Sequence, residues 1–292
     1  MHGHVGEAEY SVYNKHFTSS SEPGSRLGLI ALFSSGATDM IEGALQWRLW
    51  YLIGSGEMRR RYARSRLGQL WIILTSAIAV STIGLVWSYL WAQPVREILP
   101  YIAVGLVVWQ LISAILIEST TLLPANIRYF HNQYMPTSTI VFALAFRHSA
   151  TFFMNLIFPL ILSLSLGLRP SSSALFAIPG VLLTLIWCLW TSLMLSILCT
   201  RYRDIIQVVN NLVQVAIFLT PVLWMPELLS TRAQDLLPWN PFAVFVAIVR
   251  DPLLGRDVSW AYWVSAVIFS LGGFCASLPF LGRGRRHIVY WI

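Results

Sequence analysis

Long runs without Asp, Glu, Lys or Arg are the main feature of the sequence. A helix needs about 20 apolar residues to cross the ~30 Å hydrocarbon core of a bilayer. We expect one membrane-spanning helix in each of six segments, at about residues 67–92, 101–123, 139–168, 171–200, 205–225 and 258–281. The predicted fold class is therefore all-α, a polytopic membrane protein with six transmembrane helices.

The segment 139–168 is the least regular of the six. Arg147 and His148 interrupt it near its start, and a charge at the centre of a bilayer costs roughly 2.5–3.5 kcal/mol on insertion scales. We expect both residues to lie near the inner interface, where the Arg147 side chain extends to the lipid headgroups. An ion pair between Arg147 and Glu118, the acid near the inner end of the preceding helix, is the alternative.

Arginines divide the loops between these helices into two kinds. Loops rich in basic residues stay in the cytoplasm. They are found here before the first span (Arg59, Arg60, Arg61, Arg64, Arg66), before the third (Arg128), between the fourth and fifth (Arg201, Arg203) and after the last (Arg283, Arg285, Arg286). Both termini are then cytoplasmic, which requires an even number of spans.

Residues 39–57 are predicted to form an amphipathic helix at the membrane interface. Asp39 and Glu42 have the spacing of a capping box at the start of this helix. Its apolar side is expected to contain Leu45, Leu49, Leu52 and Ile53, with Trp47 and Trp50 on the opposite side.

Three further segments are not expected to span the membrane. Residues 1–38 are polar and contain Gly and Ser, so we expect a flexible cytoplasmic tail. In the outer connection 226–257, the apolar stretch 241–249 is too short to cross and is expected to re-enter the membrane from outside. Residues 282–292 are expected to form a cytoplasmic end, and residues 39–292 a single permease domain.

The composition excludes a soluble protein. Hydrophobic residues make up 56% of the 292 residues and charged residues 11%, whereas soluble domains contain about 25% charged residues. The net charge of +7 comes almost entirely from arginines at the ends of apolar runs. They form no continuous basic stripe, so we expect no binding of nucleic acid.

The sequence contains no motif for ATP hydrolysis or metal binding. A P-loop needs Gly-Lys followed by Ser or Thr, but the only lysine, Lys15, lies between Asn14 and His16. The six histidines are scattered, and no catalytic or metal-binding residues are predicted. An intramembrane glycosyl- or phosphotransferase that uses Glu118 or Asp204 is kept as an alternative to transport.

Five short motifs in order resemble the permeases of polysaccharide ABC exporters, in the ABC-2 type membrane family. They are RYARSRLGQLW at 61–71, RYRDI at 201–205, FLTPVLW at 218–224, NPF at 240–242 and RRHIVYWI at 285–292. The resemblance covers about residues 40–292. The family exports O antigens, teichoic acids and capsules.

This resemblance implies a homodimer in the bacterial inner membrane, bound to two copies of a separate P-loop ATPase subunit. ATP and magnesium would bind to that partner, and no cofactor to this chain. The cargo would be an undecaprenyl-linked glycan, such as an O antigen, moved from the cytoplasmic to the outer side among the membrane lipids. An ABC exporter of drugs or lipids is the alternative within transport.

The resemblance also suggests residues that contact the ATPase. In the loop 124–137 they are Asn126, Arg128, Tyr129 and His131, and at the turn 201–205 they are Arg201, Arg203 and Asp204. The alternative is that both are ordinary polar connections.

Two further sets of residues are candidates for substrate contact. Arg59, Arg60, Arg61, Arg64 and Arg66 would gather anionic lipid headgroups, at about 1 kcal/mol per basic residue near the surface; the alternative is that they only fix the topology. Trp109, Phe152, Phe153, Trp187 and Trp190 would line a path for sugars, with helix packing as the alternative.

Overall fold

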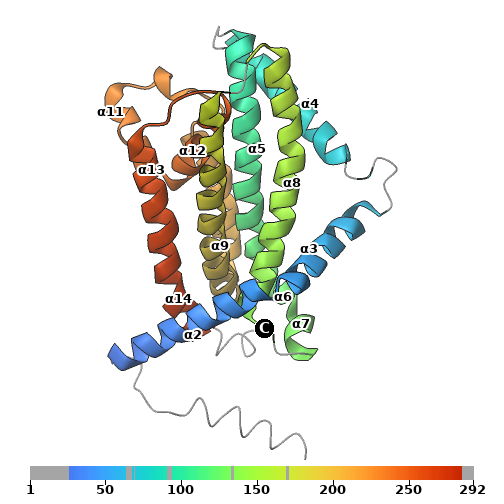
Figure 1. Ribbon diagram of the computed structural model, residues 1–292, viewed down its shortest axis with the longest axis vertical. Coiled ribbons are helices and arrows are strands. Elements are labelled where there is room, and N and C mark those ends of the chain that lie inside the picture. The colour runs from blue at the N-terminus through green and yellow to red at the C-terminus, as the bar shows by residue number, and fades with distance from the viewer. Residues whose placement is uncertain are drawn as a thin grey trace, which may run out of the picture.

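The computed structural model describes residues 26–63, 68, 70–90, 94–132, 135–168 and 171–284. Within these ranges every regular element is a helix, which confirms the predicted all-α class (Figure 1). The elements are α2 (Arg26–Leu45), α3 (Trp47–Tyr62), α4 (Leu70–Leu90), α5 (Val95–Ser119), α6 (Leu122–Ala125), α7 (Ile127–Asn132), α8 (Thr137–Ser165), η1 (Ser172–Phe176), α9 (Ala177–Arg201), α10 (Asp204–Leu219), η2 (Pro226–Leu228), α11 (Thr231–Gln234), η3 (Leu237–Trp239), α12 (Pro241–Leu253), α13 (Trp260–Val267), η4 (Ile268–Gly272) and α14 (Gly273–Gly284).

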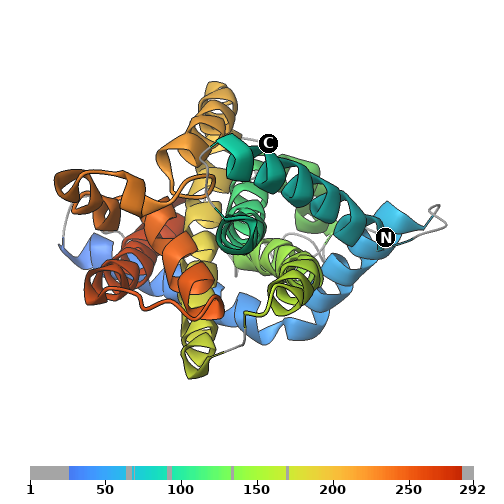
Figure 2. The same cartoon turned by 90° about the horizontal axis from the view of Figure 1, so that it is seen from above.

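The helices α5, α8 and α9 stand upright side by side at the centre of the bundle (Figures 1 and 2). Helix α5 is the most enclosed, because apolar residues surround it on all sides and nearly all of Ile98–Leu116 is buried. Helix α4 covers one flank, and the rod formed by α13, the π-helical turn η4 and α14 covers the other. The core of the molecule is therefore the surface that α5 shares with its neighbours.

Five helical segments among the described residues are long and apolar enough to cross a membrane. They are Ile73–Leu90, Val95–Ser119, Thr137–Ser165, Ser172–Arg201 and Trp260–Gly284. The irregular segment that contains Arg147 and His148 is thus a single helix of 29 residues.

The expected span 205–225 is shorter in the structure than in the prediction. Helix α10 has 16 residues, which at 1.5 Å per residue gives a length of about 24 Å, less than the ~30 Å of the hydrocarbon core. The helix ends before Pro221, because proline has no amide hydrogen and restricts the residue that precedes it. Thr220 is accordingly in extended conformation.

The helices α2 and α3 form a rod, which we call the base rod, across one end of the bundle (Figures 1 and 2). It begins at Arg26, so residues 26–38 are helical and not part of a tail, while residues 1–25 lie outside the described part. Small residues explain this difference, because they allow α2 to cross α14 closely. A Cβ atom on Gly36 would lie 2.0 Å from the carbonyl oxygen of Leu278, and one on Gly282 would lie 2.1 Å from that of Leu32.

The two sides of the predicted interfacial helix differ in what they contact. Trp50, expected opposite the apolar side, packs on Phe142 and Phe146 of α8 at centroid distances of 6.4 and 5.6 Å. Leu45 and Leu52, on the predicted apolar side, are exposed on the surface of the protein. The contact with α8 determines which apolar side chains of the base rod are buried. The helical periodicity of the sequence alone does not predict this contact.

Asp39 caps a different helix from the predicted one. It is fully buried, and its Oδ2 and Oδ1 atoms accept hydrogen bonds from the backbone amides of Thr137 and Ser138, at 3.1 and 3.0 Å. The Ser138 hydroxyl donates in return to the Asp39 carbonyl at 2.7 Å. A carboxylate at a helix N-terminus satisfies free amides and the positive end of the helix dipole. Asp39 therefore joins the base rod to the start of α8.

The close crossing of α2 and α14 makes a first prediction. Gly36→Ala places a methyl group against the Leu278 carbonyl, and we expect it to destabilise the protein by about 1–3 kcal/mol, the usual cost of overpacking. Thermal unfolding of the purified chain measures the effect. Gly56→Ala is the control, because nothing lies within 4 Å of a Cβ atom there. Equal melting temperatures for the two variants would contradict the crossing.

Candidate functional site

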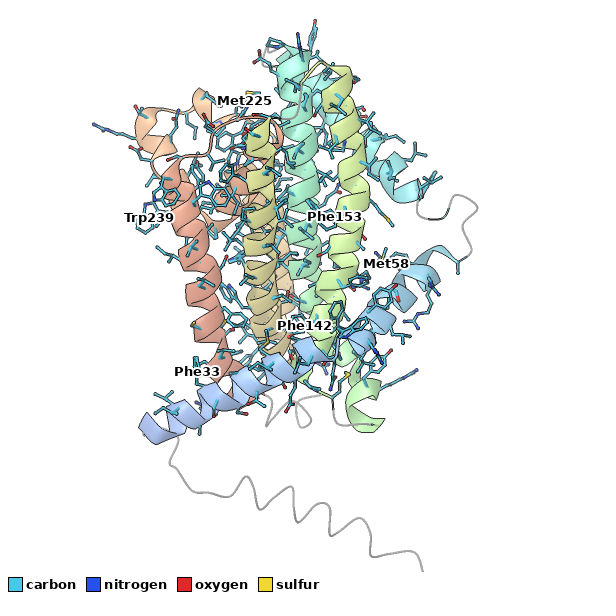
Figure 3. All side chains as sticks on the ribbon, viewed as in Figure 1. Phe33, Met58, Phe142, Phe153, Met225 and Trp239 are labelled. Carbon is cyan, nitrogen blue, oxygen red and sulfur yellow. The ribbon has the colours of Figure 1, made fainter. Side chains whose placement is uncertain are left out.

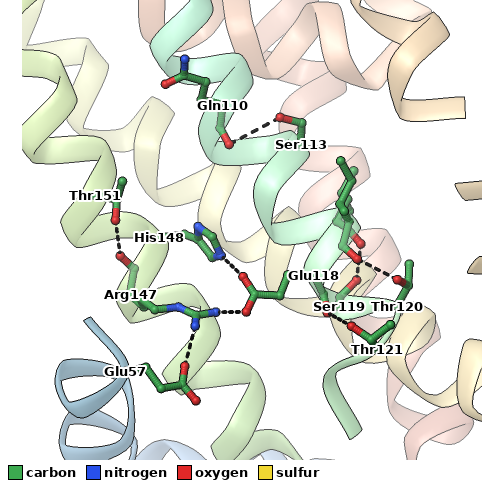
Figure 4. A network of polar contacts seen from close by, with 12 residues as sticks. Glu57, Gln110, Ser113, Glu118, Ser119, Thr120, Thr121, Arg147, His148 and Thr151 are labelled. Carbon is green, nitrogen blue, oxygen red and sulfur yellow. Dashed lines mark hydrogen bonds and ion pairs between the residues drawn. The ribbon is translucent and has the colours of Figure 1, made fainter. Parts of the chain in front are cut away.

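A cluster of charged side chains joins three helices near the base rod (Figure 4). We call it the charge network, and it consists of Glu57 on α3, Glu118 on α5, and Arg147 and His148 on α8. The Arg147 guanidinium binds Glu57 Oε2 through Nη1 at 2.5 Å and Glu118 Oε1 through Nη2. The second oxygen of Glu118 lies 2.9 Å from Nε2 of His148.

The charge network distinguishes between the two predicted positions of the Arg147 side chain, at the lipid headgroups or paired with Glu118. Arg147 and His148 are each only 8% exposed, so the guanidinium does not extend to the headgroups, and that expectation is wrong. The alternative pair with Glu118 is confirmed. A charge inside an apolar bundle is tolerated when oppositely charged groups and hydrogen bonds surround it. Here Arg147 has one such partner on the base rod and one on α5.

The other end of the bundle contains a short buried helix, α12. Its 13 residues make it about 20 Å long, and all side chains from Ala243 to Arg250 are buried. The NPF motif forms its start. Asn240 Oδ1 accepts hydrogen bonds from the amides of Phe242 and Ala243 at 3.0 and 3.4 Å, and its Nδ2 donates to the carbonyl of Leu219 at 3.3 Å. The motif thus caps α12 and ties it to the end of α10.

Arg250 fixes the far end of α12. It is 1% exposed, its Nε donates to Asp251 Oδ1 at 2.7 Å, and its Nη1 donates to the carbonyl of Pro221. Its guanidinium carbon lies 3.8 Å from the ring centroid of Tyr101 on α5, whose hydroxyl donates to the same Pro221 carbonyl at 3.2 Å. Arg250 was not among the residues selected from the sequence, although it directly follows the apolar stretch 241–249.

One face of α10 exposes amide side chains within an apolar helix. Gln207, Asn211 and Gln214, which we call the amide stripe, lie three or four residues apart and therefore on one face. Gln207 Nε2 donates to Asn211 Oδ1 at 3.2 Å. Asn210 Oδ1 is buried without a hydrogen-bond partner among the described residues. The amide side chains are neutral, so the charge pattern of the sequence does not indicate them.

The residues predicted to contact an ATPase lie at the same end of the bundle as the base rod. Arg128 and Tyr129 are exposed on α7, which projects beyond this end (Figure 1). Arg201, Arg203 and Asp204 are exposed where α9 turns into α10. Asn126 caps α6 through Nδ2 to the Leu122 carbonyl at 2.9 Å. The backbone of His131 is helical, and its side chain lies outside the described part.

The predicted cluster of five arginines begins in the last turn of α3, at the end of the base rod. Arg59, Arg60 and Arg61 are exposed in the last turn of α3. Arg64 and Arg66 lie outside the described residues. The described members thus present three positive charges next to the charge network.

The aromatic residues predicted to line a path separate into two groups. Trp109 and Trp187 are buried and hold the ring of Phe242 between them, each at a centroid distance of 5.6 Å. Phe152 is buried beside Phe153, and Figure 3 shows Phe153 on the outside of α8. Trp109, Phe152 and Trp187 therefore contribute to helix packing, and Phe153 faces outward.

Trp190 differs from the other aromatic candidates. Its Nε1 donates at 3.1 Å to the carbonyl of Phe269 in the π-helical turn η4. Together with Trp187 it lines an apolar groove of about 870 Å³ between α9 and α10. Trp187 and Trp190, two of the five predicted residues, thus line the same groove.

Apolar helices of spanning length, with their charges paired inside the bundle, define a multi-pass membrane protein. The chain belongs to the ABC-2 type transporter family, whose model matches residues 48–254. Permease subunits of this family are components of transporters and not themselves enzymes.

Three relatives agree with this assignment. The chain is 20% identical over 223 residues to the O-antigen export system permease protein RfbA of Klebsiella pneumoniae. The matched region covers 76% of this chain and 86% of the relative. A second Klebsiella pneumoniae protein of the same name is 21% identical over 217 residues, or 73% and 83% of the two chains. The namesake from Myxococcus xanthus is 28% identical over 174 residues, or 58% and 65%.

The charge network makes a second prediction. Glu118→Gln and Arg147→Met should each lower the free energy of unfolding by about 1.5–3 kcal/mol, because each leaves a charged partner without its hydrogen bond. The double variant should lose less free energy of unfolding than the two single variants together, because it leaves neither Glu118 nor Arg147 without its partner. Denaturant unfolding of all four proteins measures the coupling.

Glu42→Gln is the matched control, because Glu42 has no ion pair among the described residues. Strictly additive losses at 118 and 147, or a loss of the same size in the control, would contradict the network.

Proposed function

We propose that this chain is the permease subunit of an ATP-driven exporter that moves a lipid-linked polysaccharide, of the O-antigen type, from the cytoplasmic to the outer side of a bacterial inner membrane. The observation that carries the proposal is the match of residues 48–254 to the ABC-2 type transporter family. The names of three relatives, all O-antigen export permeases, support the choice of cargo.

The subunit has six spans in this proposal, with both termini in the cytoplasm. Five spans are the long helices described above, and α10 together with the turn at residues 220–225 is the sixth. The arginines at the inner ends of α3 and α9 support this orientation. Helix α12 is re-entrant from the outside, and the burial of all side chains from Ala243 to Arg250 supports a position within the membrane where protein surrounds it.

Two copies of a P-loop ATPase subunit drive the transport, with ATP and magnesium bound there and no cofactor bound to this chain. The absence of a P-loop from the sequence supports a separate ATPase. The exposed residues Arg128, Tyr129, Arg201, Arg203 and Asp204 form the contact surface. Because the charge network connects α3 with α5 and α8, a displacement of the base rod is transmitted directly to the central helices.

The permease is a homodimer, and the amide stripe of α10 faces the space between the two copies. Exposed amides are poorly accommodated by lipid tails, which offer no hydrogen bonds. Sugar hydroxyl groups or polar groups of the second copy supply hydrogen bonds to these amides. Trp187 and Trp190 in the neighbouring apolar groove then lie close to the path of the cargo.

The exposed arginines of α3 receive the headgroup of the cargo. Undecaprenyl-linked glycans carry phosphate groups at the membrane surface, and a basic residue near an anionic surface contributes about 1 kcal/mol. Arg59, Arg60 and Arg61 have the required exposure and lie at the end of the base rod.

Deletion of the gene tests the cargo. We expect assembled lipid-linked polymer to accumulate on the cytoplasmic side of the inner membrane, as detected by antibodies before and after permeabilisation of spheroplasts. Failure to make any polymer would overturn export in favour of an intramembrane transferase. Unchanged surface polysaccharide would overturn the cargo and favour an exporter of drugs or lipids.

The contact with the ATPase makes a third prediction. Arg128→Glu and Arg203→Glu together should reduce the ATPase that copurifies with the tagged permease at least fivefold, because they reverse two charges on the contact surface. Quantitative immunoblotting measures the ratio of the subunits. Arg232→Glu reverses an exposed charge at the opposite end, on α11, and is the control. Undiminished copurification in the double variant would contradict the assigned surface.

A further inference from the structure

Two hollows meet at the end of the molecule opposite the base rod. The outer cleft has a volume of about 540 Å³ and is lined by charged residues around the ends of α5 and α12. The outer groove has a volume of about 760 Å³ and runs along α13 beside η1 and the start of α9. Arg256 and Asp257 line both hollows. A single ligand can therefore occupy the two together.

The outer groove is apolar and open to the outside of the bundle. Phe176 and Trp263 form one wall, with their rings in an edge-to-face arrangement at 6.3 Å. Val264 and Val267 of α13 and Ile268 of η4 are exposed along its length. The groove has the size of a typical small-ligand site, about 300–1,000 Å³. Its occupant must be apolar and able to enter from the side.

The outer cleft contains charges of both signs. The Arg250 guanidinium already donates hydrogen bonds to the Asp251 carboxylate and to the Pro221 carbonyl. Arg256 is the cation at the junction with the groove, and its Nη1 lies 3.6 Å from Glu227 Oε1, a looser contact than the other ion pairs of the described part. Glu97 and Asp257 line the cleft as well. A headgroup with one positive and one negative charge fits this lining better than an anion, which the surrounding carboxylates repel.

We propose that the two hollows bind a zwitterionic phospholipid with a primary ammonium group, such as phosphatidylethanolamine. An acyl chain lies in the outer groove, and the phosphate binds Arg256. The ammonium group donates hydrogen bonds to Glu227 and its neighbouring carboxylates. A quaternary ammonium group cannot donate these bonds, which distinguishes the lipid from phosphatidylcholine. This site stands apart from the cargo, and the inference does not depend on the identity of the exported polymer.

Native mass spectrometry of the purified full-length chain tests the proposal. The detergent-solubilised protein is titrated with phosphatidylethanolamine, phosphatidylcholine or phosphatidylglycerol of identical acyl chains. We expect phosphatidylethanolamine to bind at least fivefold more tightly than either other lipid. Equal retention of all three, which indicates only annular lipid, would overturn the site, and so would a preference for phosphatidylglycerol.

Variants locate the binding. Arg256→Ala should weaken phosphatidylethanolamine binding about fivefold, and Arg256→Lys should retain most of it because the positive charge remains. Glu227→Gln should remove most of the preference over phosphatidylcholine. Val264→Trp fills the groove and should weaken binding without altering the charges. Arg232→Ala is the control, and a loss as large as that of Arg256→Ala would overturn the assignment.

Discussion

The absence of hydrogen-bond partners in a bilayer is the constraint on which this structure depends. Backbone groups in the hydrocarbon must find partners within the protein, and a buried charged side chain is costly unless it is paired. Arg250 shows the consequence most directly, because its buried guanidinium reaches an acid, a tyrosine ring and a backbone carbonyl at once. Those partners come from α12, from α5 and from the segment after α10. Satisfying one side chain therefore fixes the whole outer connection.

The same constraint organises the opposite end. Arg147 lies between acids from α3 and α5, and Asp39 of α2 binds the free amides at the start of α8. The base rod is consequently held by polar contacts near its middle and its end, and by close helix crossing at α14. Figure 3 places Phe33 on the rod and Met225 near the other end of the bundle. In the proposed function, movement of the base rod would reach the other end of the bundle through α5 and α8.

The sequence predicted what depends on local pattern and missed what depends on contact between distant segments. Run lengths identified the long helices, and two opposite charges near one interface suggested the pair of Glu118 and Arg147. The capping role of Asp39 was misassigned, because the capping-box pattern is local and the helix that Asp39 serves begins 98 residues away from it. In the candidate site, Arg250 and the amide stripe were overlooked. Their importance follows from burial and from a shared helix face, which appear only when the helices are assembled.

The central claim of this account is that the short helix α10 crosses the membrane and that its ends lie on opposite sides. The most direct test is labelling of single cysteines in intact cells with a membrane-impermeant maleimide, after replacement of Cys188, Cys199 and Cys275. Cysteine at position 232, beyond the outer end of α10, should react from outside, whereas cysteine at position 203 should react only after permeabilisation. Reaction of both positions from the same side would contradict the six-span topology.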